Sequence, residues 1–126
     1  MTQREFLSSL LEKNKDAVII GSLGTICYDL DALIPGKYFP FRGAMGCVLG
    51  VGLGYALFTH KKVIVIIGDG SFLMKMGSIA TILEYKPANL EVHIIQNDVY
   101  ASTGNQNIHF DTIKDYIPKE FIVHKI

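Results

Sequence analysis

Four short aliphatic runs recur along the chain, and segments with helical periodicity separate them. The runs are Ala17–Ile20, Val63–Ile67, Val92–Ile95 and Phe121–Val123. Strands so uniformly apolar are typical of parallel sheets that are buried on both faces. The pattern predicts a single doubly wound α/β domain over residues 1–126, with a mainly parallel sheet and helices on both faces.

Apolar residues spaced three and four apart predict two amphipathic helices. One covers about Gln3–Lys13, and the other covers about Ser71–Tyr85 and ends before Pro87. After the third aliphatic run, Asp98–Asp111 is a long polar connection. Connections of this length in compact domains are usually functional or disordered, and its place after a strand end favours a functional loop.

The segment Gly43–His60 carries no charge and raises the question of a membrane span. A spanning helix needs about 20 apolar residues, whereas this segment includes five glycines and ends in polar residues. We therefore expect a buried helix. Gly46, Gly50 and Gly54 recur every four residues, so we expect one face that lets another backbone or a flat ring approach closely. The alternative is close packing of the helix on the sheet.

Composition narrows the function classes further. Twelve Lys and Arg residues balance twelve Asp and Glu residues, which argues against a nucleic-acid partner. Cys27 and Cys47 have neither disulfide-scaffold nor metal-ligand spacing, and we expect them in the core. The polar first residues contain no signal-peptide block, which predicts a cytoplasmic protein without a membrane partner.

Polar and glycine-rich segments follow three of the predicted strands. They are Gly21–Thr25, Gly68–Ser71 and Gln96–Asp98, and the carboxyl ends of parallel strands meet at one edge of the sheet. At the start of a helix, free backbone N–H groups after Gly68 would suit a phosphate, but Asp69 would repel it. A divalent cation resolves this conflict. Asn97 supplies a neutral amide oxygen for the same ion, so the sequence predicts a Mg²⁺ site.

Two simpler interpretations compete with a cation site. Gly68-Asp69-Gly70 alone is compatible with a plain strand-to-helix turn that Asp69 caps. A dinucleotide fingerprint would need a glycine where the chain has Leu73, which disfavours a Rossmann-type nicotinamide-nucleotide enzyme. The order strand, GDG, helix, strand, Asn favours the cation site over both.

These residues carry a resemblance to a known family. GDG followed after twenty-six residues by Asn97 resembles the diphosphate and magnesium motif of thiamine diphosphate enzymes. The stretches GDGSFLMKMGSIATI and NDVYASTGNQ resemble those of the phosphonopyruvate and sulfopyruvate decarboxylase group. The resemblance implies thiamine diphosphate and Mg²⁺ as cofactors, a thiamine diphosphate-binding fold, and a small anionic 2-oxo acid as substrate.

The resemblance also implies roles for individual residues. Asp69, Asn97 and the Val99 carbonyl would bind Mg²⁺. The Gly43 carbonyl would contact the pyrimidine amine, and Met45 would hold the cofactor in a bent conformation. The diphosphate and its surroundings would involve Gly24, Thr25, Gly68, Gly70, Ser71 and Tyr100. Gln96 replaces the first of the family's paired asparagines, and Asn105 replaces a glycine.

Substrate contacts are sought first at Ser102 and Thr103, which closely follow the cation site. His109, in the same loop, is a weaker candidate. Lys75 and Arg42 are candidates for neutralising an anionic substrate, although solvated charges are the simpler interpretation. His93 is expected in the core or on a strand face, and His60 and His124 are expected in solvent.

In the resembled family, a glutamate from a separate pyrimidine-binding domain activates the cofactor, and this chain is too short to include that domain. None of its glutamates is expected near the cleft: Glu5, Glu12, Glu84, Glu91 and Glu120. We therefore expect a hetero-oligomer in which a partner subunit supplies that glutamate, with self-association of the diphosphate-binding domain. The family usually continues beyond the last strand into another helix, so a shortened, non-catalytic cofactor-binding relative is the alternative.

Overall fold

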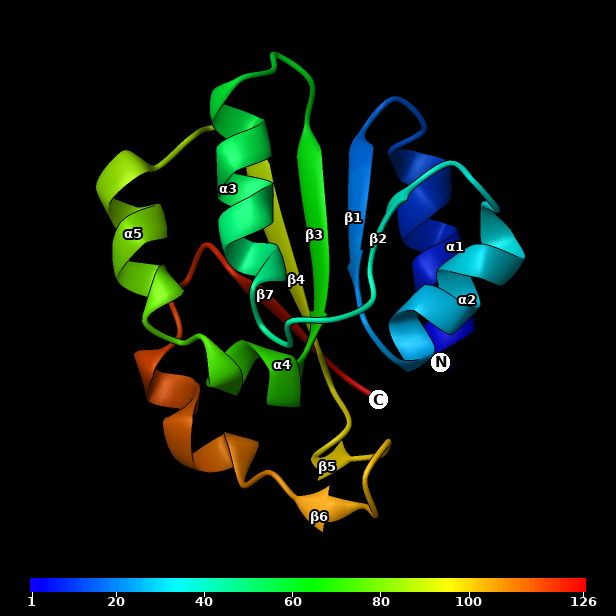
Figure 1. Ribbon diagram of the computed structural model, residues 1–126, viewed down its shortest axis with the longest axis vertical. Coiled ribbons are helices and arrows are strands. Elements are labelled where there is room, and N and C mark those ends of the chain that lie inside the picture. The colour runs from blue at the N-terminus through cyan, green and yellow to red at the C-terminus, as the bar shows by residue number, and fades with distance from the viewer.

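The computed structural model describes all 126 residues and contains one five-stranded parallel sheet. Across the sheet the order is β2-β1-β3-β4-β7, and every neighbouring pair is parallel (Figure 1). The strands are β1 (Val18–Ser22), β2 (Phe39–Phe41), β3 (Val63–Gly68), β4 (Leu90–Gln96) and β7 (Ile122–Lys125). This topology confirms the predicted doubly wound α/β class, and the order reverses between β1 and β3.

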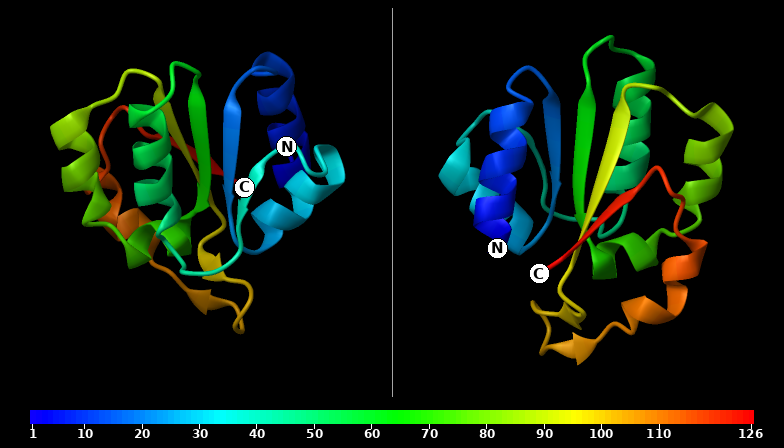
Figure 2. Two further views of the ribbon diagram at one scale, coloured as in Figure 1. Left: turned by 45° about the horizontal axis from the view of Figure 1, so that its top comes forward. Right: turned by 180° about the vertical axis from the view of Figure 1, so that it is seen from behind.

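Helices cover both faces of the sheet. Helices α1 (Gln3–Lys13) and α2 (Thr25–Leu33) pack on one face, which lies to the left of the strands in the right panel of Figure 2. The other face carries α3 (Val48–Leu57), α4 (Asp69–Met74), α5 (Ser78–Tyr85) and the 3₁₀ helix η1 (Phe110–Tyr116). A capping box between Thr2 and Glu5 starts α1, whose predicted bounds are confirmed.

The uniform aliphatic runs arise because alternate residues of each strand enter two separate cores. On β3, Ile64 and Ile66 pack toward α1 and α2, whereas Val65 and Ile67 pack toward α3. All four are fully buried. A strand covered on both faces offers its side chains little contact with water, which explains why β3 has a continuous apolar sequence.

Three elements differ from the sequence prediction. The edge strand β2 was not predicted, because it has only three residues and includes Pro40. The polar connection after Asn97 contains a short antiparallel hairpin, β5 (Val99–Tyr100) with β6 (Gln106–Asn107). The single helix predicted over 71–85 is two helices, because Lys75 leaves helical geometry at φ −132° and α5 restarts after Gly77.

The uncharged segment forms α3, which has ten residues, one buried face and one exposed face. None of the helices combines the length and apolar character that a membrane span requires. The predicted face of Gly46, Gly50 and Gly54 is wrong, because Gly46 precedes the helix and the other two lie against open space. Close packing on the sheet belongs to Gly52, where a Cβ would overlap Val65 Cγ2.

Candidate functional site

A cavity of about 480 Å³ lies at the carboxyl ends of β1, β3 and β4. Segments that follow each of these strands line it, and it lies where the strand order reverses, which is the usual ligand position in open α/β sheets. Predicted residues that line the cavity are Gly24, Thr25, Met45, Gly68, Asp69, Gly70, Ser71, Asn97, Val99, Tyr100, Ser102 and Thr103. A smaller cavity of about 300 Å³, mostly apolar, lies between α5 and the start of β4.

The loop after β1 and the loop after β4 approach each other across this cavity. Gly24 precedes α2 with φ +87°, a conformation that favours glycine, and a Cβ there would lie 3.8 Å from Ser102 Oγ. The left-handed Gly24 turns the chain sharply from β1 into α2. The two loops therefore meet as the sequence predicts.

Asp69 is the buried acceptor at the centre of the site, with 2% of its surface exposed. Its Oδ1 accepts the N–H of Gly70 at 2.9 Å, and its Oδ2 accepts the N–H groups of Asn97 at 3.1 Å and Asp98 at 2.8 Å. Burial raises the pKa of Asp69 above its ordinary value, although the three hydrogen bonds oppose the shift. The Gly70 N–H is thus not free for a phosphate, which corrects the sequence expectation.

The three predicted metal ligands all line the cavity. Asn97 Oδ1 accepts the N–H of Val99 at 3.2 Å, and the amide oxygen keeps a second lone pair. No group of three or more His, Cys, Asp or Glu side chains in the chain is arranged to hold a metal ion. The available donors are therefore one carboxylate, one amide oxygen and one backbone carbonyl, a hard oxygen set that fits Mg²⁺ rather than zinc.

Ser71 and Gly70 complete the floor of the cavity. Ser22 Oγ donates to Ser71 Oγ at 3.3 Å, and both residues are buried, so the Ser71 hydroxyl hydrogen stays available to a ligand. A Cβ on Gly70 would lie 2.6 Å from Tyr100 Cε1. Only glycine allows the Tyr100 ring to pack against the start of α4.

Strand β2 brings a fourth segment, Arg42–Cys47, to the same edge of the sheet. Gly46 has φ +91°, and a Cβ there would lie 2.6 Å from the carbonyl oxygen of Ser71. This close approach places Met45 in the cavity wall. Gly43 is exposed and does not line the cavity, so the structure does not bring it together with the other predicted residues.

The charged candidates for substrate binding lie outside the cavity. Arg42 pairs with Asp31 at 3.0 Å, Lys75 packs beside Gly46, and His109 is exposed. The expectation of a solvated His124 is wrong, because its Nε2 lies 2.9 Å from His93 Nδ1 and its ring packs at a tilt against Phe6, with 4.0 Å between the ring centroids. Asp69 is therefore the one charged residue in the cavity wall.

Sequence reasoning missed several residues that line the cavity. Gln106 lies within the polar connection Asp98–Asp111, but its position at the cavity depends on the β5–β6 hairpin. Gln3 reaches the cavity because α1 begins at the carboxyl edge of the sheet, and no local pattern indicates this. Leu23 and Ala101 also line the cavity and lie within the polar segments predicted after the strands, whereas Ile26, Met74 and Ile95 lie outside them.

Residues 20–121 match the thiamine pyrophosphate enzymes at their C-terminal TPP binding domain. The chain belongs to this family. The match covers most of the chain and includes all the strand ends that line the cavity. Membership in a thiamine pyrophosphate family argues against the nicotinamide-nucleotide alternative.

Curated relatives of the chain carry decarboxylase names. It is 38% identical over 110 residues to the sulfopyruvate decarboxylase subunit beta of Methanococcus maripaludis, covering 86% of the chain and 60% of that subunit. It is 51% identical over 73 residues to the corresponding Methanocaldococcus jannaschii subunit (58% and 39%). It is 41% identical over 98 residues to the phosphonopyruvate decarboxylase of Streptomyces viridochromogenes (77% and 25%). The chain thus spans less than two thirds of each of these relatives.

Proposed function

We propose that the chain is the thiamine diphosphate- and Mg²⁺-binding subunit of a 2-oxo acid decarboxylase. Its substrate is 3-sulfopyruvate or 3-phosphonopyruvate, and it works with a partner subunit that contains the pyrimidine-binding domain. The names of the relatives support this substrate class. The family match supports the cofactor.

One observation supports the proposal of a bound cation. The cavity wall contains a single charged side chain, the buried Asp69 carboxylate, and no lysine or arginine. A diphosphate would be repelled by this carboxylate unless a divalent cation lay between them. Asp69, Asn97 and the Val99 carbonyl would hold this Mg²⁺. The positive charge of the ion would offset the unfavourable burial of the Asp69 carboxylate.

The other wall residues bind and orient. The Ser71 hydroxyl has a free hydrogen for a diphosphate oxygen, with Gly68 and Gly70 behind it and with Gly24 and Thr25 on the opposite side. Met45 and Tyr100 provide apolar surface for the cofactor rings. Ser102 and Thr103 would position the substrate. When bound, thiamine diphosphate supplies the electron sink that decarboxylation of a 2-oxo acid requires.

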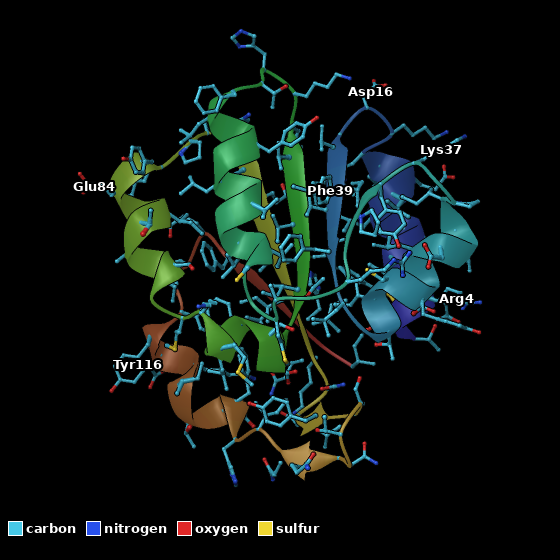
Figure 3. All side chains as sticks on the ribbon, in the orientation of Figure 1. Arg4, Asp16, Lys37, Phe39, Glu84 and Tyr116 are labelled. Carbon is cyan, nitrogen blue, oxygen red and sulfur yellow. The ribbon has the colours of Figure 1, made fainter.

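The partner is proposed because no glutamate of this chain lines the cavity. Glu84 points outward from α5, away from the strand ends (Figure 3). Glu91 pairs with His93 and with Lys62, and the Glu5 carboxylate caps α1 by accepting the N–H of Thr2. The subunit beta names of relatives are consistent with an assembly in which another chain completes the site.

Calorimetry and a carbon dioxide assay test this function. We expect the purified chain to bind thiamine diphosphate only when Mg²⁺ is present, and to release no carbon dioxide from 3-sulfopyruvate or 3-phosphonopyruvate by itself. Adding a pyrimidine-domain subunit should start turnover. Efficient turnover by the chain alone would refute the need for a partner subunit, and absence of cofactor binding would refute the proposed function. Binding without turnover in any mixture would identify the non-catalytic alternative.

A further inference from the structure

Gln96 ties together the two ends of the loop that covers the cavity. It is fully buried at the end of β4. Its Nε2 group donates to Asp98 Oδ1 at 2.6 Å and to Asp111 Oδ1 at 3.1 Å. Asp98 follows Asn97 directly, and Asp111 lies in the first turn of η1. A single buried amide therefore joins the start and the end of the loop.

Two neighbouring carboxylates need such a donor because like charges repel. Lys125 Nζ also lies near both, 3.7 Å from Asp98 Oδ2 and 3.9 Å from Asp111 Oδ2, and Lys114 pairs with Asp111. The side chain of Lys125 is 60% exposed, and solvent weakens such pairs. Gln96 is the donor that acts from a buried, fixed position.

Asp98 connects Gln96 to the predicted cation site. Its backbone N–H donates to Asp69 Oδ2, and its carbonyl oxygen accepts the N–H of Ile108 at 3.0 Å. Asp98 has φ +65°, a left-handed conformation that costs a non-glycine residue free energy and must be held by its surroundings. Asn97 and Val99 flank it on either side.

Gln96 also has a feature that stability alone does not explain. Its Oε1 is the one buried side-chain polar atom in the chain without a hydrogen-bond partner. An unsatisfied buried acceptor is destabilising, and an apolar side chain of the same size would avoid it. The amide side chain is therefore explained by the two hydrogen bonds that its NH₂ group donates to Asp98 and Asp111.

We propose that Gln96 is a positioning residue, which holds Asp98 so that the Asp69, Asn97 and Val99 oxygens share one cation. The cation part of this inference rests on the proposed function. The decisive variant is Gln96→Met, which keeps the side-chain volume, removes both donors and removes the unsatisfied oxygen. Lys119→Met is the matched control, because Lys119 lines the same surface hollow as Gln96 and forms no ion pair.

Two measurements, hydrogen exchange and apparent Mg²⁺ affinity, compare these variants with the wild-type chain. In the chain without cofactor, Gln96→Met should speed hydrogen exchange of the Asp98 and Ile108 amides by about tenfold or more, while core amides of β3 stay protected. With thiamine diphosphate present, it should weaken apparent Mg²⁺ affinity by about tenfold or more, whereas Lys119→Met changes neither quantity. Asp98→Gly removes the acceptor, suits the left-handed φ of this position and leaves the buried residue unaltered, and it should reproduce both effects.

The combined variant with Gln96→Met and Asp98→Gly tests whether Gln96 acts through Asp98. The second substitution should then add little to the first. Unchanged exchange and Mg²⁺ affinity in Gln96→Met would overturn the inference, as would losses that merely parallel a fall in global stability. If the wild-type chain binds no cofactor, the proposed function fails, and the exchange comparison alone decides whether Gln96 positions the loop.

Discussion

The backbone N–H of Asn97 donates to Asp69 Oδ2 at 3.1 Å, which joins two residues that are twenty-eight positions apart. The register of the sheet explains this contact. Gly68 pairs with Ile95 in the parallel ladder between β3 and β4, so the two strands end side by side. The intervening length is set by α4, α5 and β4. The spacing in the motif is therefore a consequence of building one crossover between neighbouring strands.

Asp69→Asn should remove Mg²⁺-dependent binding of thiamine diphosphate. The substitution removes the charge, and its NH₂ group faces N–H donors that need an acceptor. We expect a loss of affinity of about 100-fold or more and a decrease of about 1–3 kcal/mol in the free energy of unfolding. Calorimetry and urea titration measure the two effects. Asp115→Asn, at an exposed carboxylate, is the control. Equal affinity in both variants would show that Asp69 does not hold the cation.

Gly70→Ala should disturb the floor of the cavity without changing any charge. The added methyl group would lie 2.6 Å from Tyr100 Cε1 and 2.9 Å from Cδ1, so the ring must move. We expect a loss of about 1–3 kcal/mol in stability from this overpacking, together with weaker cofactor binding. Gly77→Ala, where the methyl group meets nothing within 4 Å, should leave binding unchanged. Cofactor binding as tight in Gly70→Ala as in Gly77→Ala would contradict the assigned position of Tyr100.

Sequence reasoning succeeded where the physical cause is local. Uniform apolar runs reveal the buried strands, because burial on both faces favours apolar side chains at successive positions. The convergence of the loops at Gly24, Asp69 and Asn97 then follows from parallel strand direction alone. Asn105, a departure from the resembled family, has φ +62°, and asparagine is among the few residues that tolerate this conformation.

Sequence reasoning failed where long-range contacts decide the structure. Strand β2 exists because Phe39 pairs with Ile20, and neither its length nor Pro40 indicates a strand. Without β2, the route by which Met45 reaches the cavity could not be predicted. The contribution of Gln3 has the same origin, since it depends on where α1 packs rather than on any pattern within α1.

The glycines of α3 should respond in opposite directions to alanine substitution. Gly54 lies against open space, so Gly54→Ala should stabilise the chain by about 0.5–1 kcal/mol through its higher helix propensity. Gly52→Ala should destabilise it by about 1–3 kcal/mol, because its methyl group would overlap Val65. Urea titration of both variants provides the measurement. Similar effects at the two positions would mean that α3 packs on the sheet differently from the structure described.

The pair His93 and His124 should make stability depend on pH. Burial and the neighbouring His93 lower the pKa of His124 below its ordinary value of 6.5, so the unfolded chain binds a proton more readily than the folded chain. The stability from neutral His124 is complete above pH 6.5 and is lost as the pH falls below this value. The urea midpoint should therefore fall between about pH 7.5 and about pH 5.5, and His124→Leu should reduce this fall.

Glu91 does not account for a loss of stability in this range. Although burial alone would raise it, hydrogen bonds from His93 and Lys62 hold the pKa of Glu91 below its ordinary value of 4.5. The stability from ionised Glu91 is present above pH 4.5 and is lost only at lower pH, so the two contributions separate. His60→Leu, at an exposed histidine, is the control and should leave the pH dependence of the wild-type chain intact. If His124→Leu and the wild-type chain lose the same stability on acidification, the contact between the two histidines does not control it.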